Sequence, residues 1–259
     1  MMQWVTILKK EMLEYWRNFK WIWVPIVFIL FAIMDPLSTY YLPKIIETVG
    51  GMPEGAVFEM PEVPPNAALM MSLNEFSMFG VLVIILISMG LIAGERKSGV
   101  AELVLVKPVG YFTYISSKWF STLFLMWISY VIGMLTSWYY VNLLFGEISF
   151  GTLMKVVVFY GLWLTLVLTI TIFFNTLFKT PGIVGFVTIA TMIVMFIFNQ
   201  IFSNKITWFP NNLSKHIVEM LETGTMSTEL WGTSAIIVVI TVILLFSSYF
   251  TFRNKEKAN

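Results

Sequence analysis

The sequence predicts an all-α integral membrane protein with six transmembrane helices, and its composition is the first observation that predicts it. Of the 259 residues, 58% are hydrophobic and only 12% are charged. A soluble domain has about 25% charged residues, so this chain cannot cover a surface that faces water on all sides. A soluble enzyme, a disordered chain and a collagen-like rod are therefore excluded, and the expected solvent is lipid.

The second observation is that the apolar residues form six long runs. A helix needs about 20 residues to cross a membrane, and runs that are continuous rather than alternating exclude a transmembrane β-barrel. No internal repeat or domain boundary divides them, so one transmembrane domain over residues 1–259 is predicted. The expected spans are residues 21–41, 76–93, 119–145, 152–178, 181–202 and 232–252.

The third observation is the placement of lysine and arginine, which sets the orientation in the membrane. With the N-terminus inside, the inner side carries roughly three times as many of these residues as the outer side. The sequence therefore predicts a multi-pass protein of the cell membrane with both termini in the cytoplasm. Two outer segments result, residues 42–75 and 203–231. The first is rich in Pro and Glu, and much of it is expected to be irregular because Pro interrupts helices.

Residues 3–20 precede the first span and predict an amphipathic helix in the inner headgroup layer. At about 100° per residue, one narrow arc collects most of the apolar side chains, and basic residues occupy much of the rest. The helix could be an ordinary anchor or an elbow that moves during transport, and the pattern leaves both readings open. The apolar arc consists of Trp4, Val5, Leu8, Met12, Tyr15, Trp16 and Phe19.

Residues 94–118 form a basic inner segment that is much longer than a chain reversal needs. Glu95, Arg96 and Lys97 end the second span, and Gly99 provides a permissive backbone position. A short amphipathic piece follows, and Pro108 ends it because the residue before a proline avoids the helical conformation. A short cytosolic helix of this kind suits docking into a partner's groove. A loop on the membrane surface is the alternative.

The same segment resembles the permeases of ABC-2 type transporters. The resemblance lies in a pattern E-R-K-S-G-x-x-E-L-x-L-x-K-P-V followed by a lysine before the third span. The matching positions are Glu95, Gly99, Glu102, Leu103, Leu105, Pro108, Val109 and Lys118. The six spans, the amphipathic start and a Pro, His and Gly in the last outer segment (Pro210, His216 and Gly224) are also similar. Only the long outer segment 42–75 departs from the family.

The resemblance implies that residues 94–118 couple the spans to a separate ABC ATPase, while residues 3–20 form the elbow helix. The residues expected to couple are Glu95, Arg96, Gly99, Glu102, Leu103, Pro108 and Lys118. No phosphate-binding loop G-x-x-x-x-G-K-[ST] is present, so ATP and Mg would belong to the partner and this chain is not itself an enzyme. A second copy or a similar permease would complete the pathway, with membrane lipid around it and no nucleic acid.

Few residues suggest chemistry within the spans. With no cysteine and a single histidine, a metal or catalytic site on this chain is not expected. Asp35, near the predicted outer end of span one, could line a pathway, since ionisable residues in a membrane are often functional. Its other expected role, which the sequence favours, is to cap the helix end at the outer interface. Asn175, Asn199 and Gln200 are expected to hydrogen-bond between helices.

The last outer segment predicts a short helix with one apolar side. Asn212 or Ser214 could cap its start, the helix would run to about Leu221, and Gly224 could end it. Such a helix could cover an exit path or simply pack at the interface.

The function predicted from all these features is the permease subunit of an ATP-driven exporter. Its substrate would be hydrophobic or amphiphilic, such as a lipid-like molecule, a peptide or a drug. The alternatives are a membrane sensor or resistance subunit that binds an envelope-active compound, and a sodium exporter.

Overall fold

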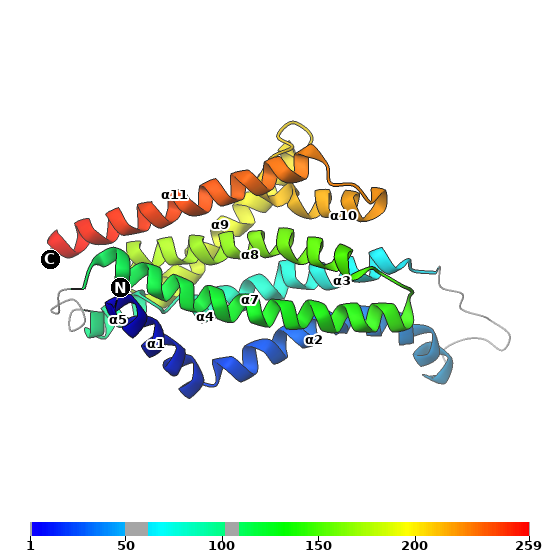
Figure 1. The fold of residues 1–259 in the computed structure, drawn as a ribbon, viewed down its shortest axis with the longest axis horizontal. Helices are drawn as coiled ribbons and strands as arrows, with labels where there is room; N and C mark the ends of the chain where they lie inside the picture. The colour runs from blue at the N-terminus through cyan, green and yellow to red at the C-terminus, as the bar shows by residue number, and fades with distance from the viewer. Residues whose placement is uncertain (1, 50–61, 102–108, 259) are drawn as a thin grey trace.

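The computed structural model describes residues 2–49, 62–101 and 109–258, and in them all regular structure is helical (Figure 1). Six helical stretches are long and apolar enough to cross a membrane. This confirms the predicted all-α class with six transmembrane helices. These stretches are Lys20–Ile46, Pro65–Lys97, Tyr111–Leu144, Phe150–Leu177, Pro181–Phe202 and Thr228–Lys255.

The chain begins with α1 (Met2–Arg17), which a tight turn at Phe19 joins to α2 (Lys20–Val49). Leu13, Trp16 and Phe19 expose most of their side chains, as expected of a helix that contacts lipid. The predicted apolar arc is nevertheless divided, because Tyr15 is buried against the bundle. The helix therefore has one face on lipid and another face on protein.

The second span consists of several helical pieces: α3 (Pro65–Glu75), the π-helical turn η1 (Phe76–Gly80), α4 (Val81–Ser88) and α5 (Ala93–Lys97). Much of outer segment 42–75 was expected to be irregular, but helix occupies both of its ends, up to Val49 and from Pro65. Proline at the first position of a helix costs no hydrogen bond, which explains the start of α3. Residues 50–61 lie outside the described structure.

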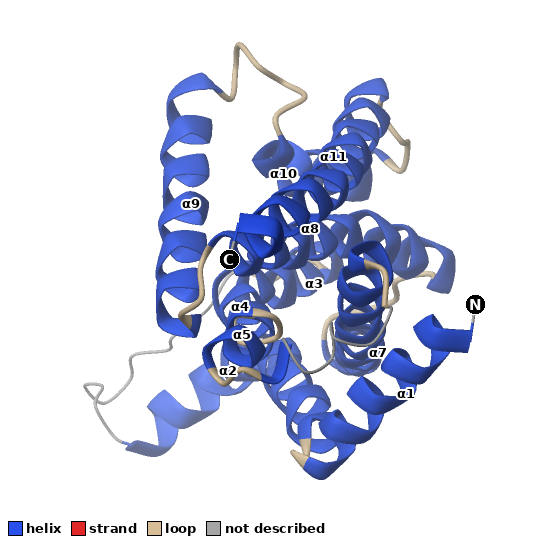
Figure 2. Cartoon of the chain, turned by 90° about the vertical axis from the view of Figure 1, so that its left-hand side faces the viewer, coloured by secondary structure: helices blue, strands red, loops and turns tan. Residues whose placement is uncertain are grey.

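The rest of the bundle contains α7 (Tyr111–Leu144), α8 (Phe150–Leu177), α9 (Pro181–Phe202), the short turn η2 (Pro210–Asn212), α10 (Leu213–Thr223) and α11 (Thr228–Ala258). Helix α8 lies at the centre of the bundle. In its most apolar 18-residue stretch 83% is buried, whereas in the corresponding stretch of α9 only 17% is buried. Viewed from the end that carries the termini, α9 stands apart beside the bundle (Figure 2). Its free side must therefore face lipid or another molecule.

Small residues let the central helices approach closely, as is common in membranes. A Cβ on Gly133 of α7 would lie 3.0 Å from the Phe28 carbonyl oxygen of α2. Nearby, the Ser72 hydroxyl of α3 donates to the Ala32 carbonyl at 2.6 Å and lies 2.7 Å from the Ser137 hydroxyl of α7. These contacts join α2, α3 and α7.

Both ends of the chain lie at the same end of the bundle, together with α5 (Figure 1). This arrangement follows from an even number of spans. We call it the termini end and the opposite one the far end.

Candidate functional site: a buried charged cluster under the first helix

Five side chains from three helices form a charged cluster at the termini end: Lys10 and Glu11 of α1, Glu95 of α5, and Tyr114 and Lys118 of α7. The Lys118 ammonium lies 2.7 Å from a Glu11 carboxylate oxygen and 3.0 Å from a Glu95 oxygen. Lys10 lies 2.6 Å from the same Glu95 oxygen, and the Tyr114 hydroxyl donates to the other one. Two ammonium groups thus neutralise two carboxylates.

Burial makes this cluster unusual for charged residues. The side chains of Glu11 and Lys118 are each 1% exposed, and that of Glu95 is 15% exposed, whereas Lys10 at the rim is 45% exposed. Charged side chains are almost never fully buried unless they are paired. Removal of either central partner would leave a charge without water or counter-ion, so the three helices are bound to one another through Lys118.

The pKa of Lys10 reflects this environment. Burial by itself lowers the pKa of Lys10, but the hydrogen bond to Glu95 and the charge of Glu11 outweigh it and hold the pKa above its ordinary value. Lys10 therefore remains an ammonium at physiological pH, and its pairing with the cluster is constant.

Further polar contacts fasten α1 to α7 beside the cluster. The buried Tyr15 hydroxyl shares a hydrogen bond of 2.6 Å with Thr122, and the Trp4 indole donates to Ser116 at 3.2 Å. Burial, and after it the charge of Glu11, raise the pKa of the Tyr15 hydroxyl, which stays neutral. Helix α1 is thus attached along its length by hydrogen bonds as well as by charge.

The break between α4 and α5 lies next to the cluster, and Asn175 of α8 stabilises it. Its side-chain oxygen accepts from the backbone N–H groups of Ile92 at 3.2 Å and Ala93 at 3.0 Å. Its amide group donates to the carbonyls of Ser88 at 3.0 Å and Thr171 at 2.9 Å. An interrupted helix in a membrane needs such substitutes for its lost backbone bonds. The short helix that carries Glu95 therefore has a defined pivot.

Of the other predicted coupling residues, the structure describes Arg96 and Gly99, and neither is among the residues that form the cluster. The buried guanidinium of Arg96 donates to the Thr176 carbonyl of α8 at 3.2 Å and lies 5.5 Å from the centre of the Phe252 ring of α11. Gly99 has φ +77°, a left-handed conformation that favours glycine, which supports its predicted role as a turn. Three further residues, Glu102, Leu103 and Pro108, lie outside the described residues.

Lys118 is located differently from its predicted position. It was expected ahead of the third span, which was predicted to begin at residue 119, but α7 begins at Tyr111 and places Lys118 inside the helix. The lysine interrupts the apolar run in the sequence, yet its charge is matched by Glu11 and Glu95. A paired charge therefore does not mark the end of this helix.

Together with Glu14, which lies beside the cluster, Glu11 and Glu95 form a set of carboxylates with the spacing of a metal site. Oxygens of Glu11, Glu14 and Glu95 lie within 4.8 Å of one another. However, the Lys118 ammonium already contacts Glu11 and Glu95, and Lys10 lies 3.7 Å from Glu14. Lysine nitrogen thus satisfies these oxygens, and we assign no metal to them.

Comparison with known proteins identifies the family of this chain. A family model for an ABC-2 family transporter protein matches residues 5–257. The chain belongs to this family. The uncharacterized transmembrane protein YxlG of Bacillus subtilis (strain 168) is 28% identical over 253 residues, which cover 97% of this chain and 98% of that protein. ABC-2 permeases are membrane transport components that generally work with an ABC ATPase.

In this ABC-2 permease, sequence reasoning did not find Glu11, Tyr114 or Asn175 as parts of the site. For Glu11 a signal was available, because at about 100° per residue it falls beside Trp4 at the edge of the apolar arc. Asn175 was expected to hydrogen-bond between helices, and it does so with the backbone of Ser88, Ile92 and Ala93. Nothing in the sequence indicated that the second span is interrupted between α4 and α5.

Asp35 of the permease lies in the middle of α2 and not near a helix end, because α2 continues to Val49. It therefore does not cap the helix, which was one of its two expected roles. The Asp35 carboxyl lies near that of Glu75, the last residue of α3, and the two groups interact electrostatically. Glu75 had been assigned to the outer segment.

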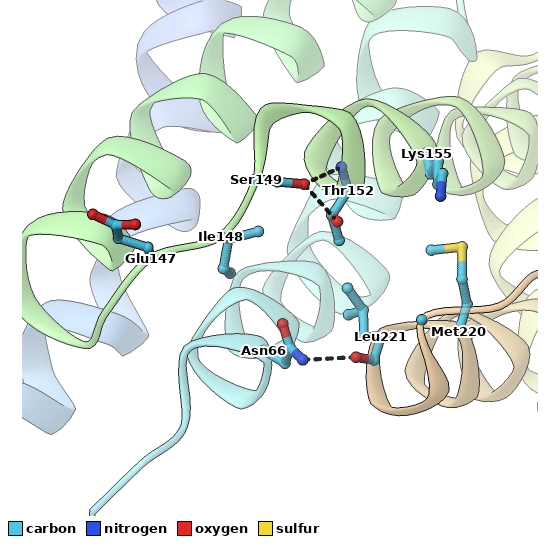
Figure 3. Close-up of a pocket in the computed structure, with 9 residues that line it drawn as sticks. Asn66, Glu147, Ile148, Ser149, Thr152, Lys155, Met220 and Leu221 are labelled. Carbon is cyan, nitrogen blue, oxygen red and sulfur yellow. Dashed lines mark hydrogen bonds between the residues drawn. The ribbon is translucent and has the colours of Figure 1, made fainter.

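At the far end of the permease, α10 packs on the bundle. Gly224, with φ +73°, ends it in a left-handed cap as predicted. Asn212 precedes the helix but does not cap it, because its amide donates to the carbonyls of Ile206 at 2.9 Å and Thr207 at 3.3 Å. Figure 3 shows Asn66 of α3 donating to the Leu221 carbonyl, at 2.7 Å, beside a cavity of about 190 Å³. The start of α3 and the end of α10 are thus joined.

Proposed function

We propose that this chain is the membrane-spanning subunit of an ATP-driven exporter that moves a hydrophobic or amphiphilic substrate out of the cell. The observation that carries the proposal is Lys118, which joins Glu11 of α1 to Glu95 of α5 at the start of the inner segment. A movement of that segment, driven by an ATPase bound to it, would be transmitted to three helices at once. The chain holds no phosphate-binding loop, so the ATPase is a second polypeptide.

The pivot at residues 89–92 supports a moving role for α5. Gly90 and Gly94 lie beside Pro181 at the start of α9, with Cβ positions 4.0 Å and 3.9 Å from its ring. A Cβ on Gly185 of α9 would lie 2.9 Å from the Met89 sulfur. A rotation of α5 would therefore push α9, the least buried of the six membrane-spanning helices. This gives a physical route from the inner surface to the lipid-facing side.

The proposal is tested by purifying the tagged full-length chain from its own membranes. The expected result is a retained polypeptide with a phosphate-binding loop and an Mg-dependent ATPase activity in the same fraction. Gly99→Pro should reduce both, because proline cannot adopt the left-handed conformation that Gly99 has. Lys155→Ala, in the far-end cavity, is the matched control and should retain both.

Two results would overturn it. One is a purified wild-type chain that never retains a nucleotide-binding polypeptide. The other is export that is unchanged in Gly99→Pro and in Glu95→Ala.

A sodium exporter is the second candidate, and the carboxyl pair of Asp35 and Glu75 favours it. Two acidic groups within membrane-spanning helices are costly unless they have a role. If the pair binds the transported ion, vesicles that contain the permease and its ATPase should move Na⁺ on addition of ATP. Asp35→Asn should abolish that movement while the protein inserts normally. Export of an amphiphile that is unaffected by Asp35→Asn would assign the pair a structural role.

A further inference from the structure

An open groove of about 670 Å³ lies between η1 and α4 on one side and α9 on the other. Its walls change character along their length. At the far end six uncharged polar side chains line it: Asn74, Ser77, Asn199, Gln200, Asn211 and Ser214. Toward the termini end its wall is apolar, with Leu82, Ile85, Ile189 and Ile193 among the residues. The groove thus has a polar part and an apolar part, as a site for an amphiphile requires.

The groove contains no ionisable residue in its lining. A phosphate or carboxylate placed there would lose water without gaining a cation, which is costly. Amide and hydroxyl side chains, by contrast, both donate and accept hydrogen bonds. They match hydroxyl groups, which also do both. The polar end therefore favours a neutral head with several hydroxyls over a charged one.

Two of these amides lack partners in the described structure. The side-chain oxygens of Asn199 and Asn211 are shielded from solvent and accept no hydrogen bond. A buried acceptor without a donor costs about 1–3 kcal/mol. Rotation of a side-chain amide by 180° exchanges the positions of its oxygen and nitrogen. The side-chain oxygen of Asn199 or of Asn211 can therefore be turned toward the groove. A hydroxyl-bearing head would supply the missing donors.

The length of the apolar part matches one leaflet. From Ile189 to Asn199 the helix rises about 15 Å at 1.5 Å per residue. This is half of the roughly 30 Å of hydrocarbon in a bilayer. Because α9 stands apart from the bundle (Figure 2), a chain can reach the groove from the lipid side. An acyl chain beside α9 would then have its head level with Asn199.

We propose that this groove binds a glycolipid-like amphiphile, with a neutral polyhydroxyl head at the six polar side chains and an acyl chain along α9. The site deepens the proposed function, since it names the class of the substrate, and it rests on that function only in calling the bound molecule a substrate.

The test uses the purified full-length chain in phosphatidylglycerol vesicles, without ATP or ATPase, so that it reports on the site alone. The probe is a monoglucosyl diacylglycerol with a photoreactive diazirine on one acyl chain, and phosphatidylglycerol with the same chain is the comparison. We expect the glucosyl probe to label α4 and α9 at least about fivefold more. Loss of two hydrogen bonds is worth about 1–3 kcal/mol, so Asn199→Leu combined with Asn211→Leu should reduce labelling about tenfold.

Two further variants keep the test decisive. Asn204→Leu, an exposed asparagine at the same end but outside the lining, should label like wild type. Ile193→Trp adds bulk at an exposed position that is 52% accessible, and should block labelling even if the double variant fails to fold.

Three outcomes would overturn the site. Equal labelling by both probes would mean that the groove selects only hydrocarbon. Labelling that persists in the folded double variant or in Ile193→Trp would place the probe elsewhere. Disulfide-linked dimers of an Ile193→Cys chain, which otherwise contains no cysteine, would mean that a second copy covers the groove. None of these bears on ATPase retention, so this site and the proposed function can fail separately.

Discussion

At the scale of single residues, the permease contains charged side chains at positions where the sequence is otherwise apolar. In the structure these side chains are paired with opposite charges. Lys118 and Glu11 are separated by more than a hundred positions, yet both are buried within 2.7 Å of each other. A buried pair of this kind is weak proof of stability, because an apolar pair could replace it, but loss of one partner is costly. Its value lies in fixing which three helices meet at the termini end.

Lys118→Met should therefore lower the free energy of unfolding by about 3–5 kcal/mol, because Glu11 loses its nearest cation inside the bundle. The measurement is denaturation by SDS in mixed micelles. Adding Glu11→Gln to Lys118→Met should recover part of the loss, since the stranded charge is then gone. Lys9→Met, an exposed lysine on the same helix as Glu11, is the control and should change little. Equal losses in Lys9→Met and Lys118→Met would contradict the pairing.

At the scale of helices, close packing depends on glycine at one crossing in particular. An added Cβ on Gly161 of α8 would lie 2.3 Å from the edge of the Trp127 ring of α7. The indole of Trp127 donates to Thr165 at 3.1 Å, so the ring is held where it is. Only glycine allows α7 and α8 this separation.

Gly161→Ala should lower the melting temperature in detergent, at a cost of about 1–3 kcal/mol for overpacking. Gly232→Ala in α11 is the matched control, because nothing lies within 4 Å of its Cβ position. Alanine is the better helix former, so this control should be neutral or stabilising by up to about 1 kcal/mol. If both substitutions behave alike, the Trp127 contact does not set the distance between the helices.

The helices also show how far sequence alone reaches. The fifth span, residues 181–202, coincides with α9 because an apolar run begins at Pro181 and contains no charge. The third span was predicted eight or so residues short, since Lys118 looked like a boundary. Glu95 and Lys118 were singled out from the sequence, but their pairing with Glu11 was not, because tertiary contacts bring Glu11 to them. Hydropathy indicates helices reliably, but it cannot show which charges are paired.

At the scale of the whole molecule, both ends of the chain and α5 lie at one end of the bundle (Figure 1), while α10 lies at the other. The distribution of lysine and arginine predicts that the termini end faces the cytoplasm, where basic residues are retained during insertion. An ATPase can reach residues 94–118 only in that orientation. Sidedness is thus the property on which every step of the proposed export depends.

Because the chain contains no cysteine, single cysteines can measure that sidedness directly. Ser98→Cys, beyond α5, and Met226→Cys, beyond α10, both replace exposed residues outside the apolar parts of the spans. In intact cells, a maleimide that cannot cross the membrane should label Met226→Cys and leave Ser98→Cys unlabelled until the membrane is permeabilised. Both cysteines are exposed and are expected on opposite sides of the membrane, so each variant serves as the control for the other. Labelling of Ser98→Cys in intact cells would place α5 and Ser98 outside, where no ATP is available, and the proposed ATPase could not drive the permease from that face.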